Sequence, residues 1–318
     1  MLLPDISMAD HLAELLGISK DSVYRRIKGE KQLSFDELAT VAAAFNVSLD
    51  ELFNLSEGHV IFHGQYVNSE DFNLESFLES MLHDVAQIQE FDQKELIYIS
   101  KDIPVFYYLM FPEIAAFKFF VWTKTQMQFN EMKKMKFSFD ILTDERKELC
   151  RKICDCQVRI PGAEILNADN ILNDLRQLEY YRDTNLFADP ADQEIIYNQL
   201  DTMISHMEAQ ASCGKKFHPG LEPDEHSAAI RMYVNDFFVG DNTIIANVND
   251  TRMVYINHSA INYISTASRE FAAYNFEFIQ NIIRKSSLIS EVGERTRNRF
   301  FNLIHERIDH SRHQVFSS

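Results

Sequence analysis

Lys20, Tyr24 and Lys28 recur at intervals of four residues, with Asp21 and Arg25 beside them. On an α-helix this spacing places side chains on one face. Ammonium and guanidinium groups, a phenol and a carboxylate can contact phosphate oxygens and the donor and acceptor groups of base edges. These residues therefore favour recognition of double-stranded nucleic acid over catalysis.

Two short helices around a tight turn are expected to position this cationic face. Apolar residues at helical spacing precede Gly17, and Gly17 stands where a helix commonly ends in a left-handed residue. Ser19 follows as the expected N-cap of the second helix. Val23 and Ile27 are expected to keep the opposite face of that helix apolar, for packing. A second helix of this kind is suited to the major groove.

Two further motifs follow the glycine turn. Ser34-Phe-Asp-Glu37 and Ser48-Leu-Asp-Glu51 each have the spacing of a capping box that opens a helix. With the turn, they make residues 7–55 resemble the helix-turn-helix domain of the Cro/CI repressor-like (XRE) family. The resemblance is specific, but it covers less than a fifth of the 318 residues.

The resemblance implies which residues contact DNA. It places a recognition helix over Ser19–Lys28 in the major groove. The family's contact positions fall on Ser19, Lys20, Asp21, Tyr24, Arg25 and Lys28. One recognition helix contacts too few bases for useful specificity, so we expect a homodimer on a palindromic operator. Its interface is expected among the helices of residues 104–212 or in the final helix pair.

Three features depart from the family pattern. Ala9 stands where many relatives have glutamine, which removes one contact. Arg26 stands where an apolar residue is common, and Ile27 is expected to take over the packing. The family has a further helix before the motif, and only Met1 to Ser7 precede it here.

Charge is distributed unevenly along the chain. The whole sequence has a net charge of −17, with 48 acidic and 31 basic residues. Residues 19–32 reverse this balance, with five cations and two acids. An acidic body is repelled by a polyanion, so specificity is left to the small basic face and binding should be salt-sensitive.

A histidine-rich sequence near the carboxyl end invites comparison with zinc peptidases. That chemistry needs histidines at i and i+4 on one helix, with a glutamate base at i+1. In His305-Glu-Arg-Ile-Asp309-His310 the i+4 position is Asp309, and His310 lies about 100° further round the helix. We therefore expect a solvated helix end here rather than a catalytic zinc site.

Three of the four cysteines are close together in the sequence. Cys150 and Cys154 share a helical face, but with Cys156 they lack the paired CxxC spacing of structural zinc sites. We expect incidental buried thiols in a reducing cytoplasm, and a metal or redox sensor is the open alternative. No metal, cofactor or catalytic group is assigned from the sequence, and an enzyme is not expected.

Residues 103–122 form the most apolar run of the chain. They include Pro104, Pro112, Glu113 and Lys118, and charges near the centre of a membrane span are costly. We expect a pair of buried helices broken at Pro112, with no membrane span. No signal peptide is recognised, and a cytoplasmic location is predicted.

The remaining pattern predicts a helix-rich α+β fold. An all-α helix-turn-helix domain (1–56) precedes a larger domain (57–318) of helices and a small antiparallel sheet, with a possible sub-boundary at 214–223. Expected strands cover about 58–67, 96–100, 232–239, 243–248, 252–258 and 261–266. Expected helices cover about 74–90, 104–135, 144–156, 163–182, 190–212, 268–285 and 290–308.

The sequence thus predicts a bacterial, cytoplasmic, sequence-specific transcriptional regulator that binds DNA as a dimer. The larger domain is expected to dimerise and to sense an effector, either a small molecule or a protein. An alternative from another class stays open, in which a vestigial helix-turn-helix sits on a protein-interaction scaffold.

Overall fold

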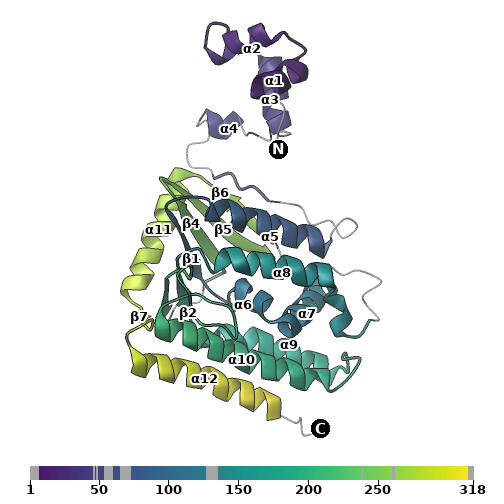
Figure 1. Ribbon diagram of the computed structural model, residues 1–318, viewed down its shortest axis with the longest axis vertical. Coiled ribbons are helices and arrows are strands. Elements are labelled where there is room, and N and C mark those ends of the chain that lie inside the picture. Colours follow the sequence, from purple (N-terminus) through teal and green to yellow (C-terminus); the bar gives the residue numbers. More distant parts are fainter. Residues whose placement is uncertain are drawn as a thin grey trace. The chain divides into compact units, whose positions relative to one another are not determined.

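The chain divides into two compact units, Met1–Ile61 and Phe62–Ser318. The computed structural model describes residues 7–45, 47, 49–53, 60–64, 73–126, 135–237, 240–259 and 262–313. Figure 1 labels helices and strands of both units.

The first unit is made of helices. These are α1 (Met8–Leu16), α2 (Lys20–Ile27), α3 (Phe35–Phe45) and the single turn α4 (Leu49–Leu52). Its small core includes Ala9, Val23 and Ala42, one residue from each of the three longer helices. The capping box predicted at Ser34–Glu37 is present. The second box and any helix before α1 lie outside the described residues, because residues 1–6 and 48 are among those not described.

The second unit is built on one mixed sheet of seven strands in the order β6-β5-β4-β1-β2-β3-β7. The central strands β1 (Lys94–Ile99), β2 (Gly162–Leu166) and β3 (Ile230–Val234) are parallel. The outer strands are antiparallel to their neighbours: β4 (Thr243–Val248), β5 (Thr251–Ser259), β6 (Asn262–Thr266) and β7 (Ser287–Leu288). The helix-rich α+β class is confirmed, and the sheet is mixed rather than wholly antiparallel.

The expected and observed sheets differ at two places in the sequence. Residues 163–182 were expected to be one helix, but they begin with β2 before a 3-10 turn and α9 (Leu172–Asp183). The strands expected at 232–239 and 243–248 follow one another in the sequence, but β3 and β4 do not pair, because β1 and β2 lie between them. The strands expected at 243–248 and 252–258 do form a hairpin, β4–β5, with a tight turn at Asn249-Asp250 in which Asn249 adopts φ 47°.

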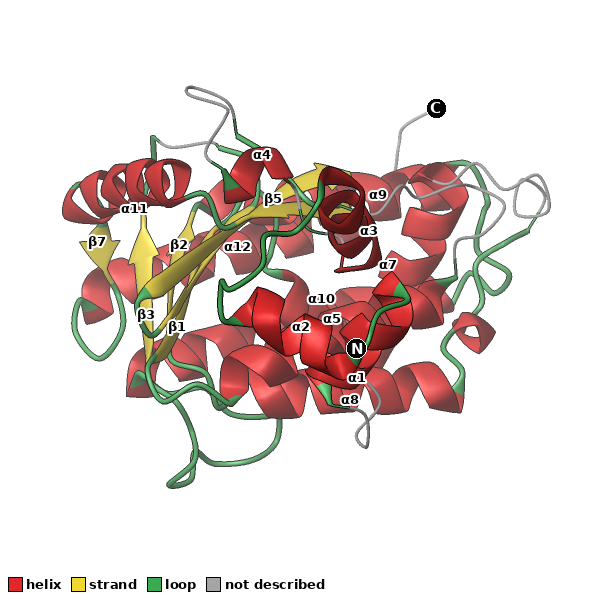
Figure 2. Ribbon diagram, turned by 90° about the horizontal axis from the view of Figure 1, so that it is seen from above, coloured by secondary structure: helices red, strands yellow, loops and turns green. Residues whose placement is uncertain are grey.

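Helices cover the two faces of the sheet unequally (Figure 1, Figure 2). One face packs against α9 and six further helices: α5 (Leu74–Gln89), α6 (Val105–Met110), α7 (Pro112–Val121), α8 (Asp144–Gln157), α10 (Asp192–Cys213) and α12 (Glu294–His313). The other face packs against α11 (Arg269–Arg284). Successive side chains of β1 point to opposite faces of the sheet, so β1 contributes to the cores on both faces. Leu96 and Tyr98 enter the first core, whereas Ile97 and Ile99 enter the second.

The apolar run at 103–122 forms α6 and α7, which break at Pro112 as predicted and lie inside the first core. No helix in the described part of the chain is long and apolar enough to cross a membrane. Lys118 is buried in this run and donates to Asp174 of α9, with Nζ 2.8 Å from Oδ1. Asp174 also accepts from the Tyr108 hydroxyl at 2.8 Å.

The other residues considered for chemistry have structural contacts. His305 pairs with Asp201 of α10, with Nδ1 and Oδ1 2.5 Å apart, so it ties α12 to α10. Cys150 and Cys154 are buried, Cys156 is half-buried and Cys213 is exposed, and all four are free thiols. Among the described residues, no group of three or more histidines, cysteines and carboxylates is placed to hold a metal ion.

A buried histidine makes the stability of the second unit depend on pH. Burial lowers the pKa of His206 to about 4, and its ring lies 3.0 Å from the Phe217 carbonyl oxygen. The unfolded chain takes up a proton near pH 6.5, so this contribution to stability is present above that pH and is lost as the pH falls toward 4. Glu164 changes the stability in the opposite direction as the pH falls, because burial raises the pKa of its carboxyl group to about 7.

We therefore expect His206→Gln to be less sensitive to acid than the wild type. Between pH 6.5 and 4 the wild type should lose up to about 3 kcal/mol more unfolding free energy than the variant. Urea titrations at each pH measure the unfolding free energy of both proteins. Because both proteins retain Glu164, its contribution cancels in the difference between them. Parallel losses in the two proteins would contradict a neutral buried imidazole.

Candidate nucleic-acid interface

The turn between α1 and α2 has the geometry expected from its sequence. Gly17 adopts φ 63° and ends α1, and the Ile18 amide donates to the Ala13 carbonyl at 3.0 Å. Ser19 caps α2 by accepting from the Ser22 amide at 3.3 Å. Both ends of the turn are thus fixed by local hydrogen bonds, which set the start of α2.

The exposed face of α2 carries the predicted contact residues. Ser19, Lys20, Asp21, Tyr24, Arg25 and Lys28 are all exposed, Tyr24 to 51%. Val23, at 2% exposure, anchors the opposite face in the core of the unit. All six side chains are therefore open to solvent on a helix whose other side is packed.

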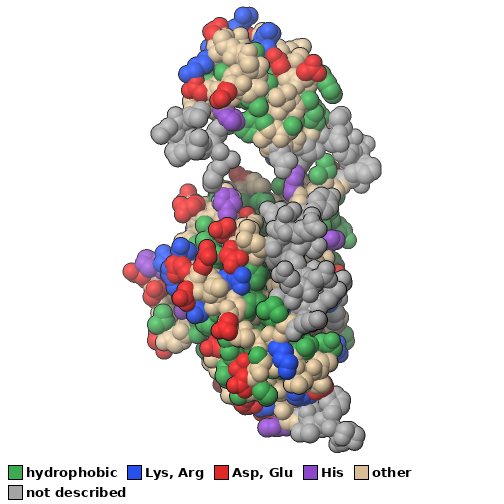
Figure 3. Space-filling view, turned by 90° about the vertical axis from the view of Figure 1, so that its right-hand side faces the viewer, with side chains coloured by type: hydrophobic (Ala, Val, Ile, Leu, Met, Phe, Trp, Pro, Cys, Tyr) green, Lys and Arg blue, Asp and Glu red, His purple; other side chains and the backbone are tan. Residues whose placement is uncertain are grey.

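Two of the cations on α2 are held by neighbouring acids. Lys20 pairs with Asp10 of α1, and the Arg25 Nε lies 3.7 Å from Glu30 Oε2. Lys28 has no ionic partner among the described residues. Exposed pairs of this kind contribute about 0–1 kcal/mol, so Lys20 and Arg25 can exchange a carboxylate for a phosphate at little cost. Cationic and acidic side chains are interspersed on this unit (Figure 3).

Arg26, rather than Ile27, packs α2 against α3, which corrects the sequence expectation. The Arg26 side chain is 7% exposed, and its Nε and Nη2 bind the Glu37 carboxylate at 3.1 and 2.5 Å. Its Nη1 also donates to the Ser22 carbonyl at 3.0 Å. Ile27 is 60% exposed. The paired guanidinium fills the site that an apolar side chain was expected to occupy.

Glu37 joins this ion pair to the capping box of α3. Its Oε2 accepts from the Ser34 amide at 2.9 Å, and Ser34 Oγ accepts from the Glu37 amide at 3.2 Å. The Arg26 guanidinium, followed by the Ser34 amide, holds the pKa of Glu37 below its ordinary value. One carboxylate therefore fixes both the start of α3 and the orientation of α2.

Ile27 is the surface residue that sequence reasoning missed. It lies seven residues after Lys20 and three after Tyr24, so it borders the exposed face of α2. The 3.6-residue period allows either residue 26 or residue 27 to pack beside Val23, and hydrophobicity favoured Ile27. The capping glutamate Glu37 was the one available signal, because it offers a partner for Arg26 but not for Ile27.

A family model described as helix-turn-helix matches residues 9–52. The first unit carries an XRE-type helix-turn-helix. The matched segment covers α1 from Ala9 onward and the whole of α2, α3 and α4, and thus all six predicted contact residues. No curated protein and no solved structure matches the chain. The XRE helix-turn-helix is a DNA-binding regulatory domain, not a catalytic one.

Proposed function

We propose that this protein is a sequence-specific transcriptional regulator whose α2 enters the major groove of its operator. The observation that carries the proposal is the two-sided construction of α2. One side is packed through Val23 and the Arg26–Glu37 pair, and the other presents the exposed contact residues. We further propose that it acts in a bacterial cytoplasm.

Each contact residue has a role that follows from its chemistry. Lys20 and Arg25 reach guanine edges or phosphates, and Asp21 can accept from the amino group of cytosine. Tyr24 contacts a thymine methyl group or a phosphate. Ser19 and Lys28, at the two ends of the helix, lie against the DNA backbone.

Selection of binding sites from random duplexes, with the full-length protein, tests this function. We expect an enriched palindromic sequence and an affinity that falls steeply as salt rises, because phosphate contacts release counterions. Genomic footprinting should then recover the same sequence. If neither specific nor salt-dependent binding appears, the regulator proposal is wrong and the protein-interaction scaffold is favoured.

We propose that the dimer forms through the outer face of α11. Most of α6 and α7 is buried, so these helices offer little surface to a partner. On α11 the exposed residues Glu270, Tyr274, Glu277 and Asn281 share one face, which continues to Lys285 at the helix end. Tyr274 is 68% exposed.

The two ends of this face are complementary under a two-fold axis that passes near Glu277. When two copies of α11 pack antiparallel, Glu270 lies opposite Lys285 of the partner subunit, and Tyr274 lies opposite Asn281 of the partner subunit. Opposite charges then meet at both ends, with an aromatic contact between them. A symmetric pair of recognition helices requires such an isologous interface.

A charge swap tests this interface. Glu270→Lys and Lys285→Glu should each weaken dimerisation by about tenfold, because each places like charges opposite one another. The double variant restores opposite charges and should recover the wild-type dissociation constant, measured by sedimentation equilibrium. Tyr274→Ala should also weaken the dimer. A double variant no better than either single one would place the interface elsewhere.

A further inference from the structure

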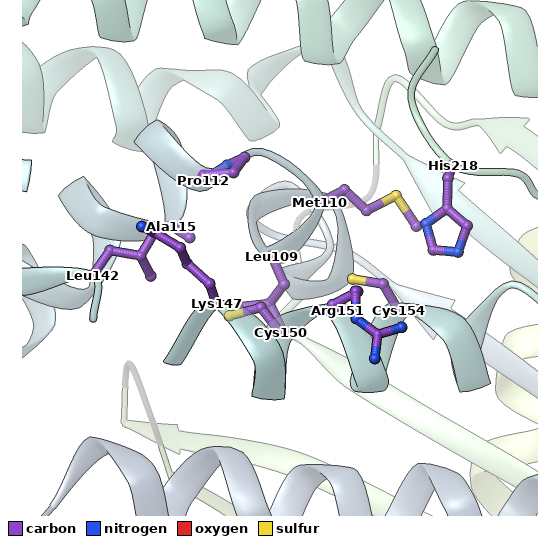
Figure 4. A pocket seen from close by; sticks show the side chains of 10 residues that line it. All are labelled: Leu109, Met110, Pro112, Ala115, Leu142, Lys147, Cys150, Arg151, Cys154 and His218. Carbon is purple, nitrogen blue, oxygen red and sulfur yellow. The ribbon is translucent and has the colours of Figure 1, made fainter. Parts of the chain in front are cut away.

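A cavity of about 180 Å³ opens between α8 and the junction of α6 and α7 (Figure 4). Leu109 and Ala115 line it from the side of α6 and α7, Cys150 and Cys154 line it from α8, and Leu142 lies beside them. A cavity of about 150 Å³ lined by apolar side chains is large enough to bind benzene. The space therefore fits one ring or a short alkyl chain.

The inner part of the cavity wall is apolar. Leu109, Leu142 and Ala115 are all buried, so the cavity reaches into the packed core. Burial raises the pKa of Cys150 to about 12 and that of Cys154 well above its ordinary value. Both thiols are therefore neutral at physiological pH and behave as small apolar groups.

The polar residues that line the cavity are all basic. Lys147, Arg151 and His218 line it, and its described lining includes no aspartate or glutamate. This is unusual in a chain with 48 acidic and 31 basic residues. Each of these side chains has a carboxylate partner outside the lining, and His218 lies 3.0 Å from Asp155, so an anion is favoured where such a partner can be displaced.

Lys147 is the basic group best able to turn toward a ligand. Its one ionic partner among the described residues is the fully exposed carboxylate of Asp144, 3.0 Å away. Arg151, by contrast, is held by Glu148 at 2.7 Å and Asp155 at 2.5 Å. An exposed pair such as Lys147–Asp144 contributes about 0–1 kcal/mol, so a ligand carboxylate can replace Asp144.

We propose that this cavity is a binding site for a small amphipathic monocarboxylate. The ring or alkyl end lies among Leu109, Ala115 and Leu142, and the carboxylate lies at Lys147. Binding of this ligand does not depend on the proposed function. Its role as an effector does rest on the proposed regulatory function. α8 packs along α5, the first described helix of the second unit, so a ligand would act on the helix that follows the helix-turn-helix unit.

Ligand-observed NMR on the full-length protein without DNA tests the binding. The probes are benzoate and hexanoate, with the neutral analogue benzyl alcohol and the cation benzylamine. We expect both carboxylates to bind, benzyl alcohol to bind more weakly and benzylamine not to bind. If neither carboxylate binds, or if benzylamine binds as well as benzoate, the proposal is overturned.

Variants locate the site. Ala115→Leu and Cys150→Met both fill the cavity and should abolish benzoate and benzyl alcohol binding, with near-ultraviolet circular dichroism confirming the fold. Lys147→Gln should weaken benzoate by about three- to tenfold and leave benzyl alcohol unchanged, because only the carboxylate loses a partner. Lys152→Gln, which removes the same charge from α8 outside the cavity, is the matched control.

Unchanged benzoate binding in a folded, filled variant would place the ligand elsewhere and overturn the proposal. Operator affinity is then measured with and without benzoate. Benzoate binding with no specific DNA binding in either condition would contradict the proposed function alone. Specific DNA binding with no benzoate binding would contradict the cavity proposal alone.

Discussion

Alanine at both Lys20 and Arg25 should lower operator affinity by about 100- to 1,000-fold, since each good contact to a base or phosphate contributes about 1–3 kcal/mol. Both side chains project from the exposed face of α2, and neither is needed for its packing. The slope of log affinity against log salt should also become shallower by up to about two if both contact phosphates. Titrations of a labelled operator at several salt concentrations measure both quantities.

The control removes the same charges from the second unit. Lys101 and Arg159 are exposed there, and Lys101 pairs at the surface with Asp241. Lys101→Ala with Arg159→Ala should leave operator affinity within about twofold of the wild type, because it changes net charge but not the recognition helix. Equal losses in the two double variants would show that overall charge, not α2, governs binding.

Replacing Lys118 by methionine should lower the unfolding free energy of the second unit by about 3–5 kcal/mol. The side chains of Lys118 and Asp174 are 4% and 3% exposed, so the variant leaves a buried carboxylate without its cation. Burial raises the pKa of Asp174, and Lys118 opposes that rise. The loss should therefore be smaller at pH 5 than at pH 7.5, since protonation neutralises the unpaired carboxyl group. Urea titration followed by Trp122 fluorescence measures it.

A second substitution separates loss of charge pairing from loss of packing. Asp174→Asn added to Lys118→Met removes the unpaired charge and keeps an acceptor for the Tyr108 hydroxyl. The double variant should recover at least about 1.5 kcal/mol relative to the single one. A single variant within 1 kcal/mol of the wild type would contradict an obligatory ion pair in the core.

The sequence by itself determined the features that depend on residues close together in the chain. Gly17 and Ser19 fixed the turn because a left-handed glycine and an N-cap act through neighbouring amides. The Ser34–Glu37 box fixed the start of α3 in the same way. The break at Pro112 follows from the missing amide of proline. These local motifs were enough to identify the XRE helix-turn-helix, and with it the helix that carries the candidate contacts.

Tertiary structure alone decided which polar residues are buried and how the strands pair. Arg26 packs and Ile27 does not, because Glu37 approaches from α3 with a carboxylate. Lys118 is stable inside an apolar run, because Asp174 reaches it from α9. Residues 162–166 form a strand because β1 and β3 supply its hydrogen bonds on both sides. In each case the deciding partner is distant in sequence, so no local pattern records it.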